Sequence, residues 1–149
     1  RGGGRAGGHD RGPRNATGLS SRRRNGARVS LHAGETVGPE SVWDALEAGA
    51  ERIGHGVNSV HDPALIRHLV AHGVVLEVSP TSNIRLGVVE SYAAHPIRAL
   101  HDAGGAVTVN TDDPPMFDTT MTGEYVALAA RVDAEVATLR EDLAAGRLS

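Results

Sequence analysis

The stretch AVTVNTDDPPMF, residues 106–117, joins an apolar run to a pair of carboxylates. The run contains Val107 and Val109, whose β-branched side chains are typical of strands. Asp112 and Asp113 follow it, and two prolines come next. Two adjacent carboxylates repel each other when they are buried, unless a cation lies beside them. The stretch therefore predicts a short strand that ends at a charged site.

Three earlier parts of the chain repeat this design, in which a short apolar run is followed by a polar cluster. Each run is rich in valine, leucine or isoleucine and has the length of a short strand. The four expected strands are residues 28–31, 51–53, 74–78 and 106–109, and the clusters after them are residues 32–35, 54–56, 79–83 and 110–114.

Helix signals separate the expected strands. Asp62 and Pro63 form an N-cap followed by a first-turn proline, and Gly73 is a typical C-terminal stop. Between them, apolar residues recur at helical spacing. Alternating strands and helices indicate βαβ units and a parallel sheet. The expected helices are residues 39–48, 64–72 and 97–103, with one or two more within residues 123–147.

The position of the polar clusters favours a barrel over a doubly wound sheet. In a (β/α)8 barrel, the residues just past the strand ends converge on one site at the top of the barrel. Four polar clusters after four successive strands would then face a common point. We therefore expect an α/β fold that forms part of a (β/α)8 TIM barrel.

The residue types in these clusters suit a metal site. His32, Glu35, His55, Asp112 and Asp113 provide imidazole and carboxylate ligands, and the chain has no cysteine. Such a set can bind a zinc-like ion and leave groups for proton transfer. Each motif alone has an ordinary structural interpretation as a turn, a surface pair or a helix cap. Their recurrence after successive strands favours a shared site.

Five segments together resemble the C-terminal half of the adenosine deaminase family, which belongs to the metal-dependent amidohydrolase barrels. The resemblance covers about residues 28–131. It implies four C-terminal βα units of a TIM barrel, followed by a C-terminal helical segment. The segments are SLHAGE (30–35), RIGHG (52–56), SPTSNIRLG (79–87), HPIRAL (95–100) and VNTDDPPMF (109–117).

The resemblance also implies roles for individual residues around one zinc ion. Glu35 matches the acid that protonates the purine ring nitrogen. His55 matches the histidine that orients and deprotonates the attacking water, while Ser82 and Asn83 look structural and hold their loop. The remaining matches are His32 and Asp112 as zinc ligands, Asp113 as the carboxylate that hydrogen-bonds the purine, and Gly34 as the residue that gives the ligand room.

The implied reaction is the zinc-dependent hydrolytic deamination of adenosine, or a related purine nucleoside, to inosine and ammonia. Two alternatives remain open from the residues alone. The substrate could be another 6-aminopurine compound, such as aminodeoxyfutalosine or adenine. The chain could instead be an inactive remnant that retains the motifs by descent, and its zinc content would distinguish that case.

Part of the family pattern is absent from this sequence. No His-x-His occurs, although the family uses that motif for two more zinc ligands, and Ser79 stands where the family usually has cysteine. Four strands are expected here, whereas a full barrel has eight. We expect the chain to be an incomplete fragment with an incomplete zinc ligand set.

The first 28 residues differ in composition from the rest. They carry eight of the fifteen arginines and eight of the nineteen glycines, with one acid, Asp10. Such a segment cannot bury a core, so we expect a disordered tail at residues 1–28 and the partial barrel at residues 29–149. No aromatic residue separates the arginines, so we do not expect a nucleic-acid partner.

The remaining expectations concern location and partners. No apolar run is long enough to span a bilayer, so we expect no membrane association and a cytoplasmic protein. The expected partner is a purine nucleoside substrate. The oligomeric state is left open.

Overall fold

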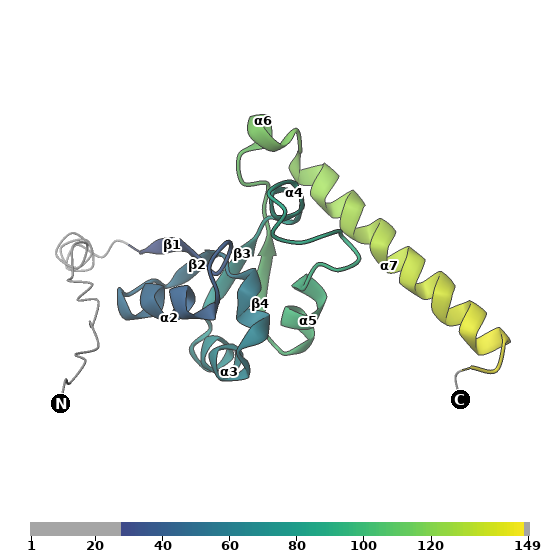
Figure 1. The fold of residues 1–149 in the computed structure, drawn as a ribbon, viewed down its shortest axis with the longest axis horizontal. Helices are drawn as coiled ribbons and strands as arrows, with labels where there is room; N and C mark the ends of the chain where they lie inside the picture. The colour runs from purple at the N-terminus through teal and green to yellow at the C-terminus, as the bar shows by residue number, and fades with distance from the viewer. Residues whose placement is uncertain (1–27, 148–149) are drawn as a thin grey trace, which may run out of the picture.

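The computed structural model describes residues 28–147, which form one sheet of four parallel strands (Figure 1). The strands are hydrogen-bonded to one another in their order along the chain. Residues 1–27, which make up nearly all of the expected tail, lie outside the described residues. The strands are β1 (Ser30–Ala33), β2 (Arg52–His55), β3 (Val75–Val78) and β4 (Ala106–Val109).

Each strand is followed by at least one helix, which is the repeating unit of a βα barrel. The α/β class and the four consecutive βα units are therefore as predicted. No described helix is long and apolar enough to cross a membrane. The helices are α2 (Pro39–Glu47), the 3₁₀ helix η1 (Val57–His61), α3 (Pro63–His72), α4 (Pro80–Arg85), α5 (Ile97–Asp102), α6 (Pro114–Phe117) and α7 (Met121–Ala144).

One face of the sheet packs against the helices. Leu31, Ile53, Leu76 and Val107 lie opposite one another in register, and all four contribute to a single hydrophobic core. Burying one such side chain fully stabilises the fold by about 1.5–3 kcal/mol. This core fixes helices and strands as one unit. The helices complete it with Val42, Ala45, Leu65, Leu69 and Leu100.

The other face of the sheet carries a polar row. His32, Gly54, Glu77 and Thr108 occupy matching register positions on the four strands. Arg52 donates a hydrogen bond from Nε to Glu77 Oε1 at 2.6 Å. That bond is the main reason why the pKa of Glu77 lies below its ordinary value. Side chains alternate between the two faces, so an apolar row and a polar row follow directly from the strand periodicity.

The strand predictions were accurate to within about two residues. The strand at residues 106–109 is confirmed at both ends, while β1 and β2 extend further along the chain than expected. His32 and His55 therefore lie inside the strands, although we expected both after the strand ends. Backbone pairing does not depend on the polarity of a side chain, so the ladder continues through these polar residues.

The helix α3 is confirmed by its capping contacts. Asp62 Oδ1 accepts from two backbone N–H groups of the first turn, at 2.8 and 3.1 Å, and Gly73 ends the helix with φ 61°. The expected loop at residues 79–83 is wrong from Pro80 onward, because Pro80 begins α4. Proline is well suited to a first helical turn, where its missing N–H is not needed.

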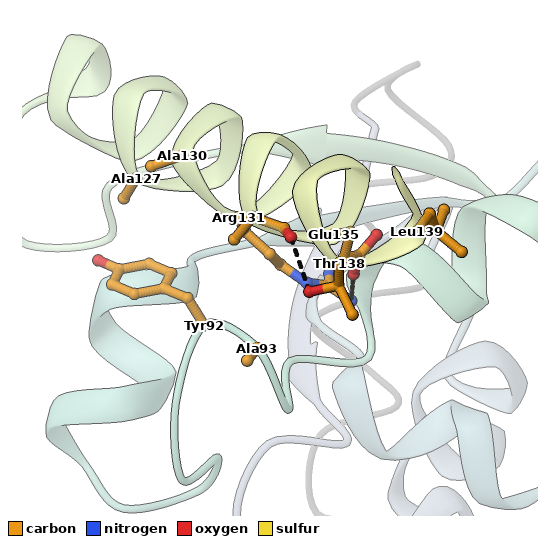
Figure 2. A pocket seen from close by; sticks show the side chains of 9 residues that line it. Tyr92, Ala93, Ala127, Ala130, Arg131, Glu135, Thr138 and Leu139 are labelled. Atoms are coloured by element: carbon orange, nitrogen blue, oxygen red, sulfur yellow. Dashed lines mark hydrogen bonds and ion pairs between the residues drawn. The ribbon is translucent and has the colours of Figure 1, made fainter. Parts of the chain in front are cut away.

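The last expected segment, residues 123–147, is mostly one helix, α7. Its first turn is tied to α4, because the buried Glu124 accepts from the Thr81 backbone N–H at 3.1 Å. Further along, Arg131 pairs with Glu135 at 3.0 Å, as Figure 2 shows. The far end of α7 extends away from the sheet (Figure 1). Its exposed apolar side chains include Val126, Val132, Val136, Leu139 and Leu143.

Gly73 offers a test of the backbone requirement at the end of α3. A Cβ atom at this position would meet nothing within 4 Å, so only backbone strain opposes a side chain. We expect Gly73→Ala to lower the free energy of unfolding by about 1 kcal/mol. Gly73→Asn should lower it less, because asparagine adopts the left-handed conformation more readily. Urea unfolding measures both losses, and equal losses would contradict this explanation.

Candidate active site

Ionisable side chains gather at the carboxyl ends of the strands. The Nδ1 atom of His55 lies 3.4 Å from Glu35 Oε1, and its Nε2 atom lies 3.9 Å from Asp112 Oδ2. The ring of His32 meets the ring of His55 edge to face, with 5.0 Å between the ring centroids. Residues from β1, β2 and the loop after β4 thus meet at one edge of the sheet, as expected for parallel strands.

A cavity of about 320 Å³ opens at this edge. His32, His55, Glu77 and Asp112 line it together with Gly54. His55 itself is buried, with 2% of its surface exposed. The cavity therefore brings together two imidazoles and two carboxylates.

Two of these residues have unusual backbone conformations. His55 has φ 64° and Asp112 has φ 59°, values in the left-handed region that non-glycine residues seldom adopt. Such strain costs about 1–3 kcal/mol per residue and is concentrated at functional sites. His55 is the last residue of β2 and Asp112 lies three residues after β4, so in both cases the chain turns close to the carboxyl end of a strand.

Gly54 makes room for the ring of His32. A Cβ atom on Gly54 would lie 2.5 Å from His32 Cδ2 and 3.1 Å from its Nε2. The two residues are paired in register on neighbouring strands, so the imidazole lies across the position where a side chain would be. Gly54 was not among the predicted site residues. A glycine inside a strand was the available signal, since it often marks close approach of another group.

The two adjacent aspartates have different surroundings. Asp112 accepts a hydrogen bond from Ser82 Oγ to Oδ2 at 2.7 Å and faces the cavity. Asp113 caps α6, because its Oδ1 accepts from the Met116 backbone N–H at 3.1 Å. The helix-cap interpretation of this pair therefore holds for the second aspartate. Asp113 is not among the residues that line the cavity.

Gly34 forms a tight turn between β1 and α2. It has φ 63°, its N–H donates to Ser41 Oγ at 2.8 Å, and its carbonyl accepts from Asn58 N–H at 2.9 Å. The Asn58 side chain also donates to the carbonyl of Glu35 at 2.7 Å. These bonds fix the backbone that presents Glu35 to His55.

Burial dominates the electrostatics of His55. Loss of solvent lowers the pKa of the imidazole below its ordinary value, while the nearby Glu35 and Asp112 carboxylates oppose this change. The neighbouring His32 lowers the same pKa further. The neutral imidazole is therefore the favoured form of His55 near neutral pH.

The donor set fits a zinc-like ion. Glu35, His55 and Asp112 each offer one ligand atom, and these atoms lie within 4.8 Å of one another. The imidazole of His32 lines the same cavity. Nitrogen and oxygen donors without thiolates are typical of catalytic zinc, which usually has three protein ligands and one open position. The two predicted ligands, His32 and Asp112, are one fewer than the usual three protein ligands.

Comparison with known proteins assigns the family. The adenosine deaminase family model matches residues 10–144. The chain belongs to the adenosine deaminase family. An aminodeoxyfutalosine deaminase from Streptomyces avermitilis is 54% identical over 108 residues, which are 72% of this chain and 30% of that protein. An adenine deaminase from Agrobacterium fabrum is 54% identical over 106 residues, which are 70% of this chain and 32% of that protein.

Solved structures of an adenine deaminase and of an amidohydrolase share the fold. An adenine deaminase from Arthrobacter aurescens superposes with a TM-score of 0.78 at 30% identity, covering 87% of this chain and 40% of the other. A zinc-bound amidohydrolase from Burkholderia ambifaria superposes with a TM-score of 0.68 at 27% identity, covering 81% of this chain and 35% of the other. The chain thus spans about a third of the length of the curated relatives it matches. The predicted family and partial-barrel fold are confirmed.

The contact between Gly54 and His32 can be tested by a double-mutant cycle. We expect Gly54→Ala to lower the free energy of unfolding by about 1–3 kcal/mol, because the new methyl group displaces the imidazole. In a His32→Ala background the same change should cost much less, since no ring remains to be displaced. Urea unfolding of the wild type, the two single variants and the double variant gives the coupling free energy between Gly54 and His32. Equal costs in both backgrounds would show that the methyl group strains something other than His32.

Proposed function

We propose that this protein contributes the catalytic edge of a zinc-dependent deaminase that hydrolyses a 6-aminopurine to the 6-oxo compound and ammonia. The observation that carries the proposal is the cavity lined by His32, His55 and Asp112, with Glu35 grouped beside His55 and Asp112 at its edge. An imidazole and two carboxylates in contact supply both ligands and proton-transfer groups.

In this proposal His32 and Asp112 hold the zinc ion, as their imidazole and carboxylate chemistry allows. When bound, zinc lowers the pKa of a water from about 15.7 to about 7 and so supplies a hydroxide at neutral pH. The hydrogen bond from Ser82 holds one Asp112 oxygen in place. Membership of the family and the zinc-bound relative from Burkholderia ambifaria support this choice of metal.

Glu35 is the proposed general acid. Its carboxyl group contacts the buried His55, and 19% of the side chain is exposed. The fixed turn at Gly34 limits the positions that the Glu35 side chain can reach. It would deliver a proton to the purine ring nitrogen as water adds to the neighbouring carbon, and such a proton transfer contributes about 10²–10⁴-fold to rate.

His55 and Asp113 have supporting roles in the proposal. His55, which lines the cavity, orients the attacking water. Asp113 hydrogen-bonds the purine, and Gly34 leaves the ring room to approach. The role of Asp113 rests on its place in the family motif, since its visible contact is the cap of α6.

The proposed substrate is adenosine or a related purine nucleoside, with aminodeoxyfutalosine and adenine as the alternatives. All three present the same 6-aminopurine ring to Glu35 and Asp113. The 54% identities to an aminodeoxyfutalosine deaminase and to an adenine deaminase support keeping both alternatives. The assignment of residues 29–149 to half of a barrel, after a tail at residues 1–28, is part of the same proposal.

A zinc measurement and a substrate panel test the proposal directly. The purified protein should contain zinc by elemental analysis and should release ammonia from adenosine, aminodeoxyfutalosine or adenine. Zinc without turnover of any of the three would overturn catalysis by this chain alone, which spans about a third of its curated relatives, and would leave the metal site standing. Neither zinc nor turnover would favour an inactive remnant.

Glu35→Gln separates the acid from the metal site. The amide keeps the size of the side chain and cannot deliver the proton, so we expect turnover to fall about 10²–10⁴-fold while zinc content stays unchanged. Ammonia release and elemental analysis measure the two effects. Wild-type turnover in this variant would contradict the acid role of Glu35.

Asp112→Ala tests the proposed ligand. We expect zinc and activity to be lost together, because one of the two ligands is removed. Asp118→Ala is the matched control, since Asp118 lies in the same segment with 94% of its side chain exposed. It should retain both zinc and turnover. Full zinc occupancy in Asp112→Ala would remove this residue from the ligand set.

A further inference from the structure

Two buried polar side chains lie behind His55 and have no role in the mechanism above. Asn83 in α4 is fully buried, and His95, just before α5, is 2% exposed. Asn83 Nδ2 lies 3.2 Å from His55 Nδ1 and 3.4 Å from Glu35 Oε1. Asn83 Oδ1 lies 3.3 Å from His95 Nε2. Asn83 thus joins both proposed catalytic residues to a buried histidine.

The direction of this chain of hydrogen bonds is set at its far end. The backbone N–H of Ile97 can only donate, and it donates to His95 Nδ1 at 3.1 Å. In a neutral imidazole one nitrogen accepts and the other carries the hydrogen, so His95 carries its hydrogen on Nε2. That N–H then donates to Asn83 Oδ1. The amide group of Asn83 is left with its two N–H donors facing His55 and Glu35.

The surroundings of His95 keep its imidazole neutral, which preserves the direction of these hydrogen bonds. Burial, and then the positive charge of Arg131, lower the pKa of His95 to about 4. Arg131 lies on α7, where its pairing with Glu135 is visible in Figure 2. A neutral His95 has one donor and one acceptor nitrogen, as the chain requires. The backbone of Asn83 is also fixed, since its carbonyl accepts from the N–H groups of Val88 and Val89 at 2.9 and 3.1 Å.

We propose that Asn83, oriented by His95, is a positioning residue that holds His55 as the tautomer with its hydrogen on Nε2. The inference rests on the proposed function and specifies how His55 acts within it. His55 Nδ1 has the Asn83 N–H at 3.2 Å and Glu35 Oε1 slightly farther away at 3.4 Å. When Nδ1 accepts from Asn83, the Nε2–H of His55 points to the side where Asp112 and the cavity lie. His55 therefore orients a water molecule as a hydrogen-bond donor. A neutral ring with its hydrogen on Nε2 does not take up the proton of that water at Nε2, so the inference departs from the second part of the role that the family resemblance implies. The second N–H of Asn83 steadies the carboxylate of Glu35.

Nuclear magnetic resonance of ¹⁵N-labelled histidine tests the tautomer without substrate or metal. Long-range ¹H–¹⁵N correlation spectra distinguish a protonated ring nitrogen from an unprotonated one. The protein has eight histidines, so the His55→Gln spectrum assigns the His55 signals by their disappearance. At a pH well above the ordinary histidine pKa of about 6.5, we expect His55 to carry its hydrogen on Nε2. A hydrogen on Nδ1 would overturn the proposal.

Asn83→Asp tests the part played by the amide. A carboxylate of the same shape can only accept, so the hydrogen of His55 should move to Nδ1. A folded Asn83→Asp protein whose His55 keeps its hydrogen on Nε2 would overturn the role of Asn83. If this variant does not fold, His95→Phe supplies the second test, since it removes the donor that orients the amide. A single unchanged Nε2–H tautomer in His95→Phe would likewise overturn the proposal.

Controls and kinetics separate this inference from the proposed function. His101→Gln removes an exposed histidine of α5 and should leave the His55 signals unchanged. With an active enzyme, Asn83→Ala should lower kcat by about 10–100-fold with little effect on KM, as for other groups that orient a catalytic residue. A protein that does not deaminate, but whose His55 carries its hydrogen on Nε2, would overturn the proposed function and leave the inference standing. An active enzyme whose His55 carries its hydrogen on Nδ1 would overturn the inference and leave the proposed function standing.

Discussion

The parallel register of β1 and β2 is the constraint on which the site depends. Pairing of Ala33 with His55 also places His32 opposite Gly54, so the one imidazole lies where the neighbouring strand has no side chain. A shift of one residue would move every side chain of β2 to the other face of the sheet. His55 would then leave the cavity and Ile53 would leave the core. The same register therefore fixes the hydrophobic core and the polar site.

The sequence was sufficient for features that depend on local chemistry. Alternating apolar and helical segments predicted the four strands, and Asp62 with Gly73 marked both ends of α3. Polar clusters at successive strand ends predicted that His32, His55 and Asp112 would lie near one another. Such predictions succeed because the carboxyl ends of parallel strands share one edge, whatever the details of packing.

Features that depend on contacts between distant residues were missed. Asn83 was interpreted as a residue that holds its own loop, yet its amide contacts His55 and Glu35 from a different βα unit. His95 was noted only as part of a motif. The polarity of their hydrogen bonds depends on the backbone N–H of Ile97, which has no signature in the sequence. Likewise, the importance of Gly54 becomes visible only when β1 is placed beside β2.

The adjacent carboxylates of Asp112 and Asp113 are compatible because the backbone separates their tasks. Asp112 has φ 59° and Asp113 has φ −97°, so the chain turns sharply between the strand and α6. One carboxylate accepts from Ser82 at the cavity, and the other accepts from the first turn of α6. Each negative charge is thus offset by its own donors, and the N-terminus of a helix favours the second charge further. Asp112 is the aspartate that lines the cavity with His32, so the proposed cation would lie beside the first carboxylate and away from the second.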